Sequence, residues 1–170
     1  LGLSQWAGDL AALMARDDRP AVWDADALNW LAETPAAADN RVITPHPGEA
    51  ATLLGLGAGE IQGDRPAALR QMQDRYGGAV VLKGAGSLIS SSVGAPWLCT
   101  AGNPGMATAG MGDVLTGIIA ALLGQGLGIE DAAALGVAIH AEAGDRAAAG
   151  GERGLMASDL SAEIRGIVNP

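Results

Sequence analysis

The residues best suited to chemistry lie in one glycine-rich run at positions 103–117. Gly105, Gly110 and Gly112 fall in this run, Asp113 follows the last of them, and an apolar helical pattern continues from there. A glycine-rich turn that opens a helix exposes backbone N–H groups at the positive end of the helix dipole. A carboxylate beside it can take a proton from a hydroxyl. The run therefore predicts a site for phosphate oxygens with Asp113 as the base, and the alternative is a tight loop whose aspartate caps the helix.

A second candidate combines an imidazole and a carboxylate on a proline-stiffened turn. His46 lies between Pro45 and Pro47, and Glu49 follows two residues later. The functional interpretation is a rigidly held histidine beside an acid. The alternative is a proline-rich turn with Glu49 in the first helical turn, where the dipole favours it. The other histidine, His140, falls in the middle of a predicted helix, and we interpret it as a core or helix-surface residue.

Two further clusters each have a structural alternative. The segment 83–87, Lys-Gly-Ala-Gly-Ser, could wrap a nucleotide, or it could be only a strand-to-hairpin turn. It lacks the spacing of a P-loop. Asp24 and Asp26 could help to hold Mg²⁺ or a hydroxyl-bearing substrate, or either could cap a helix. The late pair Ser158 and Asp159 predicts a helix cap and no more.

Strand-like and helix-like runs alternate along the chain. Apolar runs at 20–24, 41–44 and 79–83 predict buried parallel strands, and 87–90 with 96–99 predict an antiparallel pair. Predicted helices span 4–15 (capped by Ser4, with an apolar stripe of Trp6, Leu10, Leu13 and Met14), 26–33, 49–54, 65–76, 111–124, 130–149 and 157–167, and a surface loop covers 57–59 and 63–64. This order predicts an α/β fold with a mostly parallel sheet and helices on both faces. Ligands bind such sheets at the carboxyl ends of the strands, and three of the four clusters directly follow a predicted strand, while the glycine-rich run follows the hairpin.

Composition bounds the class of protein. The 170 residues indicate one domain, and the formal net charge of −9 without a basic patch argues against nucleic acid as a partner. One cysteine, Cys99, excludes an internal disulfide, and its apolar neighbours predict a buried thiol. No run reaches the roughly 18 consecutive apolar residues that a membrane span requires.

Taken together, the motifs at 24–29, 44–50, 83–87 and 103–117 resemble one family, the YjeF-type carbohydrate-kinase-like domains that are ADP-dependent NAD(P)H-hydrate dehydratases. The combination of His-Pro-Gly-Glu with Asn-Pro-Gly-Met-Ala-Thr is specific to that branch. The start of the chain, Leu1-Gly2, resembles the end of a family loop, so we expect the first strands of a ribokinase-like fold to precede it. The resemblance covers nearly all of the chain, as a single domain over 1–170.

The resemblance implies repair of hydrated NADH or NADPH, with ADP (or alternatively ATP) and Mg²⁺ as cofactors and with AMP and phosphate as products. It also implies a cytoplasmic homo-oligomer, with a tetramer favoured, that binds neither nucleic acid nor membrane. The site residues it implies are Asp113 as the base, Gly2, His46 and Asp113 for the substrate, Lys83, Gly84, Ala85, Gly86, Ser87 and Gly112 for the nucleotide, Ala109, Gly110, Met111 and Gly112 for the anion hole, and Glu49 for a metal through water.

Two positions depart from the family pattern. Ala109 and Met111 stand where the family usually has Gly and Thr or Ser, and Ala109 matters if that position needs a positive φ. Two other functions stay open at this point. One is a kinase of the same fold that phosphorylates a hydroxymethyl group of a vitamin precursor or sugar, and the other is a noncatalytic nucleotide-binding or assembly module.

Overall fold

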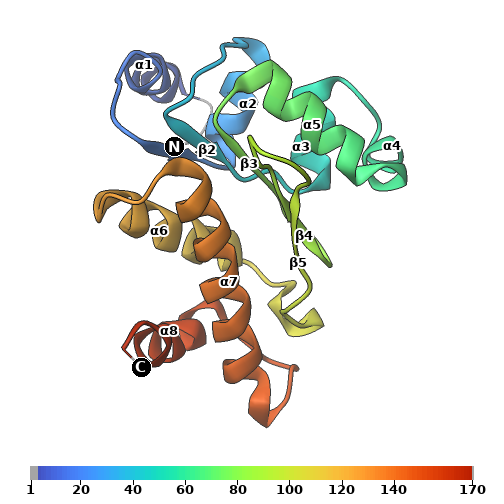
Figure 1. Cartoon of the computed structure of the whole chain (residues 1–170), viewed down its shortest axis with the longest axis vertical. Helices are drawn as coiled ribbons and strands as arrows, with labels where there is room; N and C mark the ends of the chain where they lie inside the picture. Colours follow the sequence, from blue (N-terminus) through green and yellow to red (C-terminus); the bar gives the residue numbers. More distant parts are fainter. Residues whose placement is uncertain (1–3, 170) are drawn as a thin grey trace.

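A five-stranded sheet forms the centre of the molecule (Figure 1). The computed structural model describes residues 4–169. The strands lie in the order β1 (Ala21–Trp23), β2 (Arg41–Ile43), β3 (Ala79–Leu82), β4 (Ser87–Ile89) and β5 (Trp97–Cys99). The first three are parallel, and β4 and β5 form an antiparallel hairpin that continues from β3. The predicted α/β architecture with a mostly parallel sheet is therefore confirmed.

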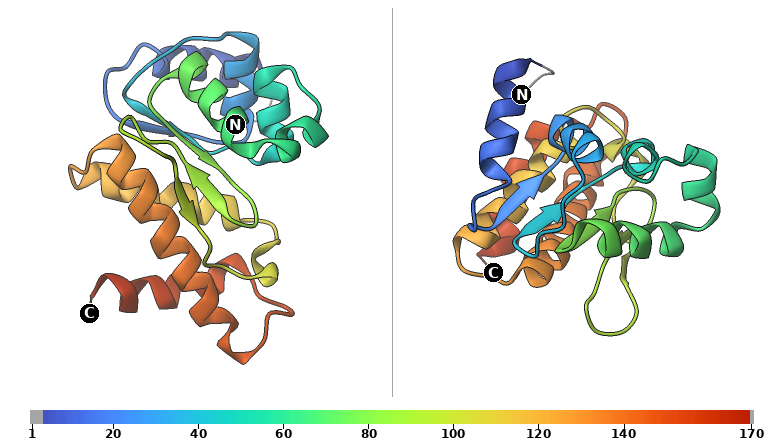
Figure 2. Two further views of the ribbon diagram at one scale, coloured as in Figure 1. Left: turned by 45° about the vertical axis from the view of Figure 1, so that its right-hand side comes forward. Right: turned by 90° about the horizontal axis from the view of Figure 1, so that it is seen from above.

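Helices cover both faces of the sheet, as predicted (Figures 1 and 2). One group comprises α2 (Asp26–Glu33), α3 (Pro47–Leu54), α4 (Ala58–Gly63) and α5 (Arg65–Tyr76). The other comprises α6 (Met111–Gly124), α7 (Ile129–Ala147) and α8 (Leu160–Val168). Within residues 4–169, no helix combines the length and the apolar character needed to cross a membrane.

Alternating side chains on the strands divide the core into two halves. Ile43 and Val80 pack with the α2–α5 group, whereas their neighbours Val42 and Val81 pack with α6 and α7. Successive side chains on a strand point to opposite faces, so one short apolar strand contributes to both halves. This explains why every position of β2 and β3 is buried and why β3 is a continuous apolar run.

Close packing of α6 against α7 depends on a glycine. A Cβ at Gly136 would lie 2.5 Å from Cγ1 of Ile119, which is inside van der Waals contact. The missing side chain therefore lets the two helix backbones approach. This contact holds α7 against the middle of α6, the helix whose first turn belongs to the candidate site.

Four predicted elements need correction. Residues 58–63 form the helix α4 rather than a loop, because the Glu60 carboxylate accepts a hydrogen bond from the Gly57 N–H and Ile61 is fully buried. Helix α3 starts two residues earlier than predicted, at Pro47. Residues 157–159 form a 3₁₀ turn before α8, and Asp159 accepts a hydrogen bond from the Met156 N–H in that turn instead of capping the helix through its side chain.

The fourth correction concerns the first helix, α1 (Gln5–Met14). Its Ser4 cap is confirmed, but the apolar stripe does not form the packed face. Trp6 and Leu13 are 65% and 68% exposed, while Ala7 and Ala11 are buried. The reason is position: α1 precedes the edge strand β1, and no other described element covers its outer side.

We expect Gly136→Ala to lower the free energy of unfolding by about 1–3 kcal/mol, because the new methyl group overpacks the α6–α7 contact. Gly117→Ala is the matched control. Gly117 lies in α6, and a methyl group added there would meet nothing within 4 Å, so this change should stabilise the helix by about 0.5–1 kcal/mol. Urea denaturation of both variants measures the difference, and equal effects would contradict the close approach.

Candidate active site

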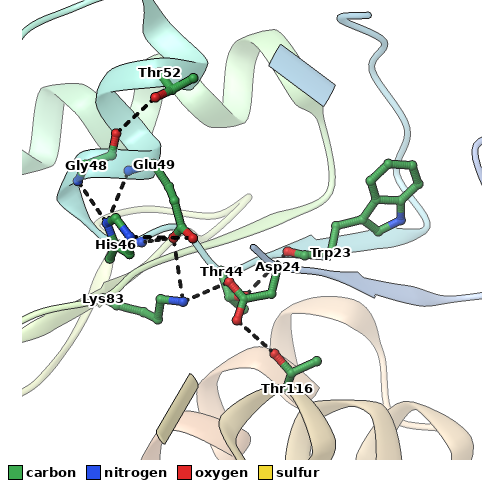
Figure 3. A network of polar contacts seen from close by, with 9 residues as sticks. All are labelled: Trp23, Asp24, Thr44, His46, Gly48, Glu49, Thr52, Lys83 and Thr116. Atoms are coloured by element: carbon green, nitrogen blue, oxygen red, sulfur yellow. Dashed lines mark hydrogen bonds and ion pairs between the residues drawn. The ribbon is translucent and has the colours of Figure 1, made fainter. Parts of the chain in front are cut away.

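An ion pair joins the ends of two strands at the carboxyl edge of the sheet (Figure 3). Nζ of Lys83, just after β3, lies 2.8 Å from Oδ1 of Asp24, just after β1. The same ammonium lies 3.7 Å from Oε2 of Glu49, in the first turn of α3. All three side chains are at least four-fifths buried, so solvent screens the network only weakly. Lys83 is therefore held between two carboxylates rather than free.

The first turn of α6 rests on this ion pair. Thr116 Oγ1 donates to Asp24 Oδ2 at 3.2 Å. A Cβ at Gly112 would lie 3.3 Å from Asp24 Oδ2 and 3.4 Å from Lys83 Nζ. A side chain at position 112 would press on the pair, so glycine lets the helix start close above it.

The helix-cap alternatives for the two early aspartates are not what the structure shows. The N-cap of α2 is Ala25, which makes no side-chain cap bond, and Asp26 lies in the first helical turn. Ala25 has φ +50°, and it is the only residue other than glycine with a positive φ in the described part of the chain. A non-glycine residue in this region is strained, and such strain concentrates at functional sites.

His46 has a structural role that the sequence left open. Its Nδ1 accepts hydrogen bonds from the N–H groups of Gly48 at 3.0 Å and Glu49 at 3.2 Å, and Glu49 Oε2 accepts from the His46 N–H at 2.7 Å. These bonds form a capping box at the start of α3. The imidazole is 56% exposed, and its Nε2 lies 3.6 Å from Glu49 Oε1. Only Nε2 therefore remains for a ligand.

The N-terminus of α6 is open, as an anion site requires. Gly110 is its N-cap with φ +87°, and no side chain caps the helix. Asp113 is the third residue of the helix, so the alternative that it is the capping residue is wrong. Its side chain is exposed, and it forms no hydrogen bond or ion pair with any residue in 4–169. The helix thus presents unpaired N–H groups and a free carboxylate together.

The two departures from the family pattern are accommodated. The positive φ belongs to Gly110 and not to Ala109, so alanine at 109 carries no such strain. Met111 is 5% exposed and packs against Ala143, Leu155 and Leu160. Its side chain therefore packs into the core.

A cavity of about 490 Å³ lies beside this helix start. The predicted nucleotide loop forms one wall, from Lys83 to Ser87, and Met111 and Gly112 form another. Ala109 and Gly110 do not line it. Cys99 and His140 also line the cavity. Cys99 is only partly buried, which corrects the prediction of a buried thiol.

Arg65 holds the loop 83–87 in shape. Its Nη2 donates to the carbonyl oxygens of Leu82 at 3.1 Å and Gly86 at 2.9 Å. Gly84 has φ +149° and Gly86 has φ +76°, so both positions favour glycine. Burial lowers the pKa of the Arg65 guanidinium. Sequence reasoning missed this residue, because nothing local distinguishes an arginine that reaches across 21 positions.

The opposite side of the cavity is anchored to α7. Asn103 Nδ2 donates to the Gly144 carbonyl at 3.0 Å and to Asp145 Oδ1 at 2.9 Å, and the Gly102 N–H donates to Asp145 Oδ2 at 2.9 Å. Met106 fills the space that a side chain at Gly144 would occupy. These bonds fix the glycine-rich run before α6 begins.

A second cavity of about 260 Å³ holds the free carboxylate. Asp113, Thr116, Asp24 and Asp26 line it, together with residues of α1 and β1. Asp24 lies on this cavity and its partner Lys83 on the larger one. The ion pair therefore lies between the two cavities. The larger one is lined by the loop 83–87, and the smaller one contains Asp113, the candidate base.

The structure brings most of the predicted site residues to one edge of the sheet. Asp113, Gly112 and the 83–87 loop are neighbours through the Lys83–Asp24 pair. His46 and Glu49 line neither cavity and reach the site through Lys83. Gly2 lies outside the described residues. Thr116 was missed, because its link to Asp24 spans 92 positions.

Known proteins match the whole chain. The family model described as NAD(P)H-hydrate dehydratase matches residues 1–165. The bifunctional NAD(P)H-hydrate repair enzyme of Coxiella burnetii is 52% identical over all of this chain and 35% of its own length, and that of Escherichia coli is 49% identical over all of this chain and 33% of its length. The ADP-dependent (S)-NAD(P)H-hydrate dehydratase of Neisseria meningitidis is 43% identical over 95% of this chain and 58% of its length. The chain thus spans about a third of the bifunctional relatives.

Solved structures agree with the sequence matches. The ADP/ATP-dependent NAD(P)H-hydrate dehydratase of Bacillus subtilis, co-crystallised with ATP and Mg²⁺, superimposes with a TM-score of 0.87 at 25% identity, over 99% of this chain and 61% of that one. A ribokinase-like protein of Enterococcus faecalis gives 0.85 at 27% identity, over 99% and 60%. The expected fold is confirmed, and the chain belongs to the NAD(P)H-hydrate dehydratase family with a ribokinase-like α/β fold.

Proposed function

We propose that this chain carries the centre that converts (S)-NAD(P)H-hydrate to NAD(P)H, with ADP consumed and AMP and phosphate released. The observation that carries the proposal is Asp113: a free carboxylate beside uncapped helix N–H groups, one ion pair away from a glycine-loop cavity. The name of the Neisseria relative supports ADP as the phosphate donor.

Phosphorylation makes the dehydration feasible, because hydroxide is a poor leaving group and phosphate is a good one. Asp113 takes the proton of the substrate hydroxyl, and the oxygen forms a bond to the β-phosphorus of ADP. The bond from that phosphorus to the bridging oxygen breaks and releases AMP. The ring-nitrogen lone pair then expels phosphate from the ring carbon, and loss of a proton from the adjacent carbon restores the dihydropyridine.

The chain's own groups suit each part of this step. The N–H groups at the start of α6, around Met111 and Gly112, would stabilise the charge on the transferring phosphoryl group. The loop 83–87 would hold the nucleotide through backbone groups. The Nε2–H of His46 would contact the hydrated dinucleotide.

Mg²⁺ fits this site only as an ion carried by the nucleotide. Among residues 4–169, no group of three or more His, Cys, Asp or Glu side chains could hold a metal by themselves. Mg²⁺ at phosphate sites keeps several waters and needs one or two carboxylates. Glu49, whose carboxylate keeps lone pairs beyond its bonds to His46 and Lys83, would hold it through water. The ion would neutralise phosphate charge.

The direct test mixes the protein with ADP, Mg²⁺ and hydrated NADH and follows the return of the reduced-nicotinamide absorbance band. We expect recovery that depends on ADP, with AMP and phosphate formed in equal amounts to the NADH. No recovery, combined with phosphorylation of a sugar or vitamin-precursor alcohol, would replace this proposal with the kinase function.

Asp113→Asn should reduce turnover by about 10²–10⁴-fold, because the amide cannot accept the hydroxyl proton. ADP binding should persist, since Asp113 bonds to none of the described residues that shape the cavity. Steady-state kinetics and calorimetric titration with ADP measure the two effects separately. Loss of both would show that the carboxylate is structural.

Lys83→Met should lower the free energy of unfolding by about 1–3 kcal/mol, because it leaves the Asp24 and Glu49 carboxylates largely buried without a cation. Arg146→Met is the control: this arginine pairs with Glu142 at the surface, where a pair contributes at most about 1 kcal/mol. Thermal denaturation compares them. Equal losses would mean that the network contributes no more than a surface pair.

A further inference from the structure

One residue that lines the larger cavity carries a buried nitrogen with no hydrogen-bond partner among residues 4–169. Nε2 of His140 is buried, and it forms no hydrogen bond with the described part of the chain. His140 belongs to α7 and lines the same cavity as the loop 83–87. Buried polar groups in native proteins almost always have a partner, so an orphan nitrogen on a residue that lines a cavity indicates a partner that arrives from outside.

The surroundings of His140 suit a neutral hydrogen-bonding group. Burial lowers the pKa of this histidine, hydrogen bonding to the Met111 backbone raises it, and the positive charge of Lys83 lowers it again. Its position beside both Met111 and Lys83 places it between the start of α6 and the nucleotide loop. A neutral imidazole offers one donor and one acceptor nitrogen.

The other unpartnered atom on this wall cannot take the same role. Asn103 Oδ1 is also buried without a partner in the described residues. Its side chain is fixed by two bonds from Nδ2, to Gly144 and Asp145, and a Cβ at Gly105 would lie only 2.9 Å from the oxygen. His140 has no such pair of anchors on its free nitrogen.

We propose that His140 is a contact residue for the adenine nucleotide, with Nε2 hydrogen-bonded to the bound molecule. This inference rests on the proposed function, since it assumes that the cavity takes ADP. It adds a residue from α7 to a site otherwise built from the loop after β3 and the start of α6.

The proposal makes two separate predictions for His140→Leu. The dissociation constant for ADP should rise about 3- to 10-fold, because one hydrogen bond is lost. The midpoint of thermal unfolding without nucleotide should stay the same or rise, because an unsatisfied buried nitrogen is removed. A histidine with a purely structural role would lower the midpoint and leave the affinity unchanged.

His140→Gln is the matched variant, because a glutamine amide can place a polar atom near the Nε2 position. Its dissociation constant for ADP should stay within about twofold of that of the original chain, because the hydrogen bond to the nucleotide is kept. Leu135→Gln, at an exposed position on the same helix, controls for changes to α7 and should alter neither quantity. Unchanged ADP affinity in His140→Leu would overturn the proposal.

A measurement on the unaltered chain guards against a variant that fails to fold. The chain contains two histidines, so imidazole ¹⁵N spectra contain two sets of signals, which His46→Asn assigns. Addition of ADP should shift the Nε2 signal of His140, and an unmoved signal under saturation would overturn the inference. If the unaltered chain binds no ADP with Mg²⁺ present, the proposed function itself fails. If it binds ADP and the His140 signal does not move, only the inference about His140 fails.

Discussion

The ion pair between Lys83 and Asp24 is the contact on which the rest of the site depends. It joins the ends of β1 and β3 across the intervening strand β2, at 2.8 Å. Glu49 approaches it from α3, and Thr116 and Gly112 approach from α6. Because desolvated charges are costly unless they are paired, these elements have few alternative arrangements. A single pair of charges thus fixes how the helices on both faces meet at the sheet edge.

The fold delivers this arrangement through short strands and close helices. Strands of three or four residues suffice because each apolar side chain of β2 and β3 packs into one core half or the other. On one face, the missing side chain at Gly136 lets α7 hold α6 close to the sheet. On the other, the α5 residue Arg65 reaches through to the loop after β3. Rigid elements therefore support a site that is made largely of backbone groups.

Features that depend only on neighbouring residues could be predicted from the sequence, whereas features that depend on tertiary contacts could not. Apolar runs predicted all five strands, and the glycine-rich run predicted an open helix start, since both are properties of adjacent residues. The short helix α4 was missed because its only core contact is Ile61, among glycines typical of a loop. Trp6 and Leu13 follow a helical period, yet only the neighbours of α1 decide whether that face is covered.

Site residues divide in the same way. Asp113 and the 83–87 loop belong to motifs, so their types and spacing were informative. Arg65 and Thr116 act through contacts that only folding creates, and only folding brings His140 to the cavity. Glu49 and His46 were recognisable as a pair, but the capping box that binds them to each other is a matter of geometry.

That capping box fixes the chemistry that His46 can offer. Because Nδ1 accepts two backbone N–H groups, the single proton of the neutral ring must reside on Nε2. The exposed edge of the ring is therefore a donor and not an acceptor. A carbonyl or phosphate oxygen can bind there, whereas an amino group finds no lone pair. The cap at the start of α3 therefore makes His46 selective for ligand groups that accept hydrogen bonds.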